Sequence, residues 1–335
     1  MDKNLMVSVS IVTYNHKNYI SQCLDSVLMQ ETTFPFEIIL GEDESNDGTR
    51  EICIEYAKKF PDKIKLFLRS RKDVIYVNGY ASGRFNMLEN LKSTNGNYIA
   101  LLEGDDYWTD PLKLQKQVDI LEENKTLVAC HHWQKIAIQK DEKYLEVDSP
   151  KDGYYSQPVS NVKAIFSNKL RLKSRTLMFR NIIDDNFFPD WFTKMAFGDV
   201  PLSFLLGKHG DFGFLDEEMA VYRQSGKGVS TAGLSELGHK QFTVQHFKSW
   251  IEIWDYADMH YNYKFHKEAT ATVFEFYNKI IPNLPFTLGA YIGLLKYNLT
   301  ERQLLFYKTL PHTFWLLNLI FKLFTKKVKK KLKKL

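Results

Sequence analysis

The sequence predicts an α/β protein with a mostly parallel central sheet, flanked by helices and followed by a helical extension. Three observations lead to this prediction. The first 130 residues alternate short apolar runs with amphipathic segments, which is the pattern of strands and helices in turn. Acidic clusters follow two of the apolar runs, at the sheet edge where ligands collect. Beyond residue 230 the pattern becomes helical and rich in aromatic residues.

The first half of the chain contains four strand and helix pairs. Strands are expected at 7–13, 36–40, 64–68 and 98–102, and helices at 19–29, 49–59, 85–91 and 111–123. Repeated pairs of this kind form βαβ units, and such units make a parallel sheet.

The pattern changes after residue 125. Antiparallel strands and a polar loop at 139–153 are expected between residues 126 and 155, and another strand is expected at 174–180. A helix is predicted at 200–206 and an extended segment at 212–222. Prolines then punctuate the helical region at Pro282, Pro285 and Pro311.

Composition excludes several classes of protein. The chain has 335 residues, 44% of them hydrophobic and 25% charged, which is ordinary for a globular protein. Its three cysteines form no CxxC pair, which argues against a disulfide framework or zinc site and favours a reducing compartment. No apolar run approaches the roughly 18 residues that a membrane-spanning helix needs, so we expect no integral membrane segment.

The acidic cluster after the fourth strand is a candidate metal site. Glu103, Asp105 and Asp106 lie between apolar flanks, and Gly104 permits a close backbone approach. Mg²⁺ and Mn²⁺ prefer oxygen ligands and usually take only one or two from the protein, which leaves positions for phosphate and water. The alternative is that these acids cap the next helix or lie on a solvated turn.

The acidic cluster after the second strand begins like a calcium loop. Asp43, Ser45, Asp47 and Gly48 have the right spacing, but the twelfth position is Ile54, which cannot bind calcium. A nucleotide site remains, in which Asp43 accepts hydrogen bonds from a base or ribose and Asp47 caps the next helix. The chain has neither a GxGxxG nor a GxxxxGK[ST] loop, which argues against a dehydrogenase or P-loop NTPase.

Three motifs in order resemble those of the family 2 glycosyltransferases. They are VSVSIVTYNHKNYISQCLDSVLMQ at the first strand and helix, GEDESNDGT at the nucleotide loop, and GRFNMLENLKSTNGNYIALLEGDDYWTDPLKLQKQ, which ends in a DxD-type metal motif. The match is strong over residues 5–125 and looser to about 230. The resemblance implies the GT-A fold, which is Rossmann-like, with a helical C-terminal extension.

The resemblance also implies roles for individual residues. It implies a nucleotide pocket lined by Thr13, Tyr14 and Asn15, base or ribose contacts from Glu42 and Asp43, and a pyrophosphate contact from Arg84. A surface salt bridge is the alternative for Arg84. Glu103 stands where the family usually has Asp, Asp105 matches the principal metal ligand, and Asp106 follows it.

The resemblance implies an inverting transfer, in which a base takes a proton from the acceptor hydroxyl. Asp199, after Gly198, matches the family's position for that base; a helix N-cap is the alternative role, and Asp190 is a second candidate base. Tyr222, Arg223, Gly226 and 228–230 resemble the family's YRxHxxGVS segment. Ser225 stands in place of its histidine, and His239 is a possible substitute.

The C-terminal segment predicts an interfacial helix. Residues 322–335 hold eight lysines and no acid, and without them the formal net charge of +5 becomes −3. Apolar residues recur every three or four positions from Leu317 to Leu335, as in helices that lie on anionic membranes. The alternative is an unfolded basic tail or one that docks on a protein partner.

The sequence therefore predicts an inverting, metal-dependent glycosyltransferase. The expected donor is a nucleotide diphosphate sugar, most simply a UDP-sugar, and the expected acceptor is a saccharide or lipid-linked hydroxyl in cell-surface polysaccharide synthesis. The cofactor is expected to be Mn²⁺ or Mg²⁺, and no nucleic-acid partner is expected. Residues 1–230 would form the catalytic domain, 231–310 a helical region, and 311–335 a tail on the inner face of the membrane. The alternatives are a non-catalytic sugar or nucleotide-binding module and a hydrolase with paired carboxylates.

Overall fold

The computed structural model describes residues 6–140, 143–149, 157–224, 234–280 and 283. The chain divides into two compact units, Met1–Ala232 and Gly233–Leu335. Each is described by itself.

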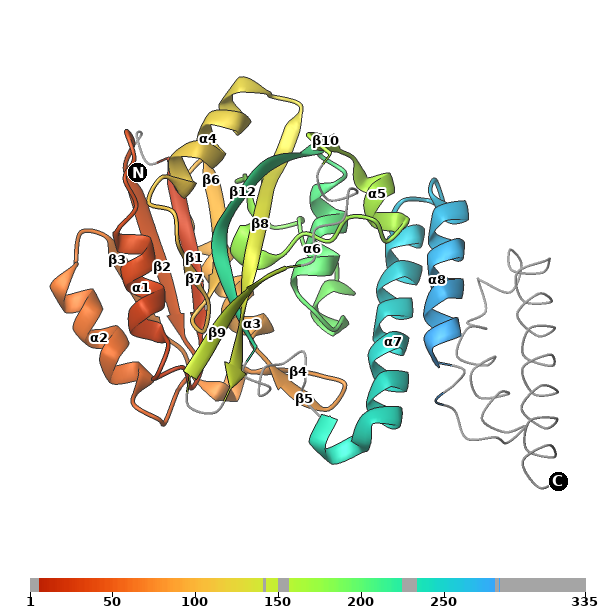
Figure 1. Cartoon of the computed structure of the whole chain (residues 1–335), viewed down its shortest axis with the longest axis horizontal. Helices are drawn as coiled ribbons and strands as arrows, with labels where there is room; N and C mark the ends of the chain where they lie inside the picture. The colour runs from red at the N-terminus through yellow and green to blue at the C-terminus, as the bar shows by residue number, and fades with distance from the viewer. Residues whose placement is uncertain (1–5, 141–142, 150–156, 225–233, 281–282, 284–335) are drawn as a thin grey trace. The chain divides into compact units, whose positions relative to one another are not determined.

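The first unit is built on one large mixed sheet. Within the described residues its strands follow the order β10-β12-β8-β11-β6-β1-β2-β3, with β7 paired to β12 and β9 paired to β8 (Figure 1). The half that begins at β6 is parallel and contains β1 (Val7–Thr13), β2 (Phe36–Glu42), β3 (Ile64–Leu68) and β6 (Tyr98–Glu103).

The other half of the sheet is mixed. The long strands β8 (Leu127–Lys140) and β12 (Asp211–Gln224) are parallel to each other, curve strongly and run side by side in Figure 1. Between β6 and β8 lies β11 (Met178–Arg180), antiparallel to both. The remaining strands are β7 (Tyr107–Trp108), β9 (Lys143–Asp148), β10 (Val159–Ser160) and the separate hairpin of β4 (Ile75–Val77) and β5 (Tyr80–Ser82).

Helices follow the parallel strands as expected. The α-helices of this unit are α1 (Ile20–Leu28), α2 (Thr49–Lys59), α3 (Arg84–Lys92), α4 (Lys113–Glu123), α5 (Val162–Phe166) and α6 (Asp199–Leu206). Short 3-10 helices occur at η1 (Arg71–Asp73), η2 (Ser174–Thr176) and η3 (Phe192–Lys194).

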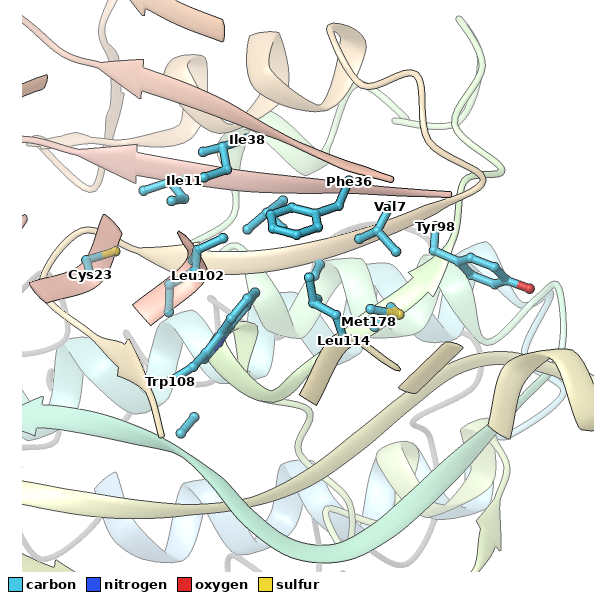
Figure 2. Packing of buried hydrophobic residues seen from close by; sticks show 14 of the residues in the cluster. Val7, Ile11, Cys23, Phe36, Ile38, Tyr98, Leu102, Trp108, Leu114 and Met178 are labelled. Carbon is cyan, nitrogen blue, oxygen red and sulfur yellow. The ribbon is translucent and has the colours of Figure 1, made fainter. Parts of the chain in front are cut away.

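The core lies on the parallel half of the sheet. Burial of β1 is almost complete on both faces, because a central parallel strand is covered by helices on each side. Figure 2 shows the packed side chains, among them Val7, Ile11, Cys23, Phe36, Ile38, Tyr98, Leu102, Trp108, Leu114 and Met178. Burying one such large apolar side chain contributes about 1.5–3 kcal/mol, so this half is a rigid base for the loops at its edge.

Two asparagines fasten α3 to the sheet. Asn90 donates its side-chain N–H to the carbonyls of Ile11 and Ile39, at 2.8 and 3.1 Å, and Asn86 donates to the carbonyl of Gly41 at 2.8 Å. A Cβ atom at Gly41 would lie 2.0 Å from Asn86, so only glycine permits this approach. The contacts hold the ends of β1 and β2 in place.

The predicted elements agree with the structure in most places. The fold class is confirmed, and the strands at 7–13 and 64–68 have the expected bounds. The strand predicted at 174–180 is wrong in its first part, because η2 occupies Ser174–Thr176 before β11 begins. The polar loop predicted at 139–153 is also wrong in part, because β9 lies within it and pairs antiparallel with β8.

The second unit is helical where it is described, as the predicted C-terminal extension requires. It contains α7 (Leu234–His260), which is interrupted at Gly238, and α8 (His266–Ile280). The two helices pack through Trp250, Trp254 and Phe276, whose ring centroids lie 5.2–5.9 Å apart. No helix in the described part of the chain is long and apolar enough to cross a bilayer. The predicted tail at 311–335 lies outside the described residues.

Candidate active site

Three loops meet at the carboxyl edge of the parallel strands. The register places Thr13 beside Glu42, and Val12 beside Glu103. The backbone N–H of Asp43 donates to the Thr13 carbonyl at 3.1 Å, and that of Gly104 donates to the Val12 carbonyl at 2.9 Å. The predicted nucleotide and metal motifs therefore lie on adjacent strand ends, where open α/β sheets bind ligands.

Hydrogen bonds join the loop after β1 to the loop after β2. Asn15, which has φ 54°, donates its N–H to the Ser45 hydroxyl and accepts the N–H of Asn46 on its side chain. The N–H of His16 donates to the Thr49 hydroxyl at 2.8 Å. The two loops are thus one preorganised rim.

Two acids of the second loop are committed to the fold. Glu42 is fully buried, pairs with Arg50 and accepts the N–H of Ser45. Asp47 accepts the N–H and hydroxyl of Thr49, the first residue of α2, but the N-cap is Gly48, so the capping role predicted for Asp47 is wrong in position. Neither carboxylate is free for a ligand without breaking these contacts.

Of the other two acids, Glu44 accepts the hydroxyl of Ser70 and the N–H of Arg71, and Asp43 faces an aromatic and cationic surface. Arg71 of η1 pairs with its carboxylate at 2.9 Å and lies 3.9 Å above the ring of Tyr14. Burial raises the pKa of Asp43, and the Arg71 charge opposes that shift. A carboxylate beside a flat, partly exposed pair is suited to a nucleobase. Sequence analysis missed Arg71, which sits in a polar stretch with no motif.

Two acids of the metal motif face inward. Glu103 accepts the hydroxyl of Ser174, and Asp106 pairs with Arg175 at 2.5 Å and accepts the N–H of Arg223 at 2.9 Å. Burial raises the pKa of Glu103 to about 7 and that of Asp106 to about 6, and Arg175 opposes both shifts. Their positions are those of structural groups.

Asp105 faces outward instead. Its side chain is 21% exposed, and no described residue donates a hydrogen bond to its carboxylate. Nε2 of His16 lies 3.9 Å from Oδ2 of Asp105. The backbone carbonyl of Asp105 accepts a hydrogen bond from Arg223 at 2.5 Å, so the loop is anchored while its carboxylate stays open. Burial lowers the pKa of His16, and the charge of Asp105 opposes that shift.

This arrangement fits a divalent cation that shares its ligands with a substrate. Within the described residues no group of three or more His, Cys, Asp or Glu side chains is placed to enclose a metal. A single open carboxylate at the edge suits Mg²⁺ or Mn²⁺, which keep several positions for phosphate and water. Asp105 is therefore the residue that would hold such an ion.

Arg84, the first residue of α3, lies near Asp199, the first residue of α6. Arg84 is buried, donates to the Met195 carbonyl at 2.7 Å and stacks 4.6 Å from the Phe192 ring. The surface salt bridge considered for Arg84 is therefore wrong. Burial lowers the pKa of Arg84 to about 10, and the Asp199 charge opposes the shift.

Asp199 is the first residue of α6 and is half-buried. Its carboxylate accepts the N–H of Val200 at 3.0 Å, and the helix cap itself is Gly198. The preceding residue, Phe197, has φ 57°, a strained value for a bulky residue and a common feature of functional sites. The exposed Asp190 lies nine positions earlier. Residues 225–230 of the segment that resembles YRxHxxGVS lie outside the described residues.

The fold is of the GT-A type. Residues 8–188 match the model of the family described as Glycosyl transferase family 2, and the chain belongs to that family. An uncharacterized protein of Mycobacterium tuberculosis is 31% identical over 232 residues, which are 67% of this chain and 60% of the relative. The chain thus spans three fifths of that relative's length.

Two solved structures share the fold. TarS 1-349 of S. aureus in complex with UDP-GlcNAc superposes with a TM-score of 0.57 at 17% identity, over 82% of this chain and 72% of TarS. The mannosyltransferase PcManGT of Pyrobaculum calidifontis, in complex with GDP-Man and Mn²⁺, superposes with a TM-score of 0.53 at 15% identity, over 91% and 84% of the two chains. These likenesses establish the fold.

Proposed function

We propose that this glycosyltransferase is metal-dependent and inverting, and that it moves a sugar from a UDP-sugar to a hydroxyl of a saccharide or lipid-linked acceptor in cell-surface polysaccharide synthesis. The observation that carries the proposal is the open carboxylate of Asp105 beside the rim formed by the Thr13–Lys17 and Glu42–Thr49 loops. The UDP-GlcNAc bound by TarS and the Mn²⁺ bound by PcManGT support the choice of ligands.

The donor would bind across this rim. Tyr14 and Arg71 would stack on the base, Asp43 would accept a hydrogen bond from it, and Thr13 and Asn15 would line the ribose side. Asp105 would hold a Mn²⁺ or Mg²⁺ ion, which when bound supplies positive charge to the leaving diphosphate. Glu42, Glu103 and Asp106 would shape the pocket through their buried partners without contacting the donor.

In the transfer itself, Asp199 would accept the proton of the acceptor hydroxyl. The hydroxyl oxygen forms a bond to the anomeric carbon as the bond from that carbon to the diphosphate oxygen breaks. The electron pair leaves with the nucleoside diphosphate, and attack from the opposite face inverts the anomeric configuration. Arg84 would hold the Met195–Asp199 segment in place through its hydrogen bond to the Met195 carbonyl. It would not contact the pyrophosphate, because its guanidinium is buried.

A panel of UDP- and GDP-sugars, each with Mn²⁺, Mg²⁺ or EDTA, tests the proposal through release of nucleoside diphosphate. We expect release with one UDP-sugar that EDTA abolishes, loss of about 10²–10⁴-fold in Asp199→Asn, and an inverted product by NMR. A protein that binds donor without releasing diphosphate would be a binding module instead. Asp190→Asn is the matched control and should retain activity.

The lysine-rich tail would hold the enzyme on the inner face of the membrane. Eight lysines contribute roughly 1 kcal/mol each near an anionic surface. A variant that ends at Pro311 should lose sedimentation with anionic vesicles and retain transfer to a soluble acceptor. Unchanged sedimentation of that variant would contradict the assignment.

A further inference from the structure

His16 is held in one orientation beside the metal motif. Its backbone N–H donates to the Thr49 hydroxyl at 2.8 Å, and its ring Nδ1 lies 3.2 Å from the Thr13 hydroxyl. The other ring nitrogen, Nε2, faces the carboxylate of Asp105, with 3.9 Å between Nε2 and Oδ2. A histidine that ligates a metal commonly has its second nitrogen bonded to an oxygen in this way.

The metal motif has room for this ring only because it contains Gly104. A Cβ atom at that position would lie 2.5 Å from the Thr13 hydroxyl and 2.9 Å from Nδ1 of His16. Any larger residue would push the Thr13–His16 turn away from Asp105. Gly104 therefore allows the ring of His16 to lie close to the metal motif.

We propose that Nε2 of His16 is the second protein ligand of the divalent cation held by Asp105. This inference rests on the proposed metal-dependent function. Adjacent ligands of an octahedral Mg²⁺ lie about 2.9 Å apart, so Nε2 and Oδ2, which are 3.9 Å apart, would approach each other by about 1 Å to bind one ion. The imidazole supplies a nitrogen ligand from the loop after β1, and phosphate and water complete the site.

One position of the resembled motif lacks its histidine, and His16 would take over that role. Ser225 stands where the YRxHxxGVS segment has its histidine, and sequence analysis named His239 as a possible substitute. His239 is an exposed residue of α7 in the second unit. His16 lies in the first unit beside Asp105, and its N–H donates to Thr49 at the end of the loop that carries Asp43 and Asp47.

Pulsed electron paramagnetic resonance of Mn²⁺ bound to the full chain with UDP tests the ligand directly. A coordinated imidazole gives nitrogen modulation of the Mn²⁺ signal, which UDP and water do not give. We expect this modulation in the wild type and in His239→Gln, and its loss in His16→Gln. Mn²⁺ affinity should fall at least about tenfold in His16→Gln. His16→Asp should restore Mn²⁺ affinity without the nitrogen signal.

The outcomes separate this inference from the proposed function. If Asp105→Asn binds Mn²⁺ as tightly as the wild type, the metal site itself is misplaced and both proposals fail. If Mn²⁺ binding depends on Asp105 but the wild type lacks nitrogen modulation, or His16→Gln retains it, only the role of His16 is overturned. Loss of the signal in His239→Gln would assign the ligand to the second unit.

Discussion

The two acidic loops at the sheet edge divide their carboxylates in the same way. After β2, Glu42 and Asp47 are held by Arg50 and Thr49, and Asp43 faces the rim. After β6, Glu103 and Asp106 are held by Ser174 and Arg175, and only Asp105 is open. The loops differ in the acid that remains, since the carboxylate of Asp43 is paired with Arg71, whereas no described residue donates a hydrogen bond to the carboxylate of Asp105. Residue type does not separate these carboxylates: Asp43 is buried like Glu42, but its partner Arg71 also lies over the ring of Tyr14, and Asp105 is partly exposed.

The largest expected effect is on turnover in Asp105→Asn. Because a bound metal supplies several kcal/mol to a charged leaving group, we expect loss of about 10³-fold in nucleoside diphosphate release. The free energy of unfolding should change by less than about 0.5 kcal/mol, because no described residue donates a hydrogen bond to the carboxylate and His16 lies 3.9 Å from it. Turnover assays and urea denaturation check the two parts. An unfolded or fully active Asp105→Asn variant would contradict the claim that Asp105 binds a ligand while Asp106 supports the fold.

Asp106→Asn should lower stability, whereas Asp105→Asn should lower turnover. The change leaves Arg175 buried without its full counter-charge, which costs about 3–5 kcal/mol for buried pairs. Urea denaturation should show the loss, and Arg175→Met in the same chain should recover part of it. Normal stability of the single variant would show that the two neighbouring acids are not divided as described.

Lys113 is a buried basic residue whose hydrogen-bond partner, Gln117, is neutral, unlike the Asp partner of Arg175. Lys113 is fully buried, donates to Gln117 at 2.6 Å, and burial lowers its pKa to about 7. Since the unfolded chain binds this proton up to about pH 10.5, stability should rise with pH above 7. From pH 7.5 to 9.0 the wild type should gain about 2 kcal/mol more than Lys113→Met. Equal gains by urea denaturation would mean that Lys113 keeps its charge.

Asp43→Asn should weaken nucleotide binding without weakening metal binding. Loss of a hydrogen bond to a charged acceptor costs about 1.5 kcal/mol, so the Kd for UDP should rise about tenfold by calorimetry. Mn²⁺ binding should persist, because Asp105 is intact. A UDP affinity equal to that of the wild type would show that Asp43 does not face the base.

The smallest effect is expected for Asp47→Ala. Loss of the contacts at the start of α2 should cost about 1 kcal/mol of stability, measured by thermal or urea denaturation. The affinity for UDP should change less than in Asp43→Asn. A larger loss of UDP affinity than in that variant would reverse the roles of the two acids.

Sequence reasoning predicted the parallel half of the fold because its signals are local. The runs that became β1 and β3 are short, apolar and bounded by turn residues, and the register then places both acidic loops at one edge. The strand predicted at 174–180 was wrong in its first part. Residues 174–176 are all polar, so they give no apolar signal for a strand or a helix, and they form η2, which packs against β6.

The division of labour among the acids was not predictable in the same way. Asp105 and Asp106 are neighbours of the same type, and what separates them is Arg175, 69 positions further along. His16 was also missed, because its approach to Asp105 depends on Gly104 and on the hydrogen bonds of two loops. Contacts between distant segments leave no periodic signal in a single sequence.

The most direct test of the account is the coupling between metal and nucleotide at Asp105. Calorimetry of UDP binding, with Mn²⁺ and with EDTA, would be compared in the wild type and in Asp105→Asn. We expect Mn²⁺ to tighten UDP binding at least about tenfold in the wild type, or about 1.4 kcal/mol, and to have no effect in the variant. Equal tightening in both proteins, or none in the wild type, would contradict the assignment of Asp105 as the residue that joins metal and donor.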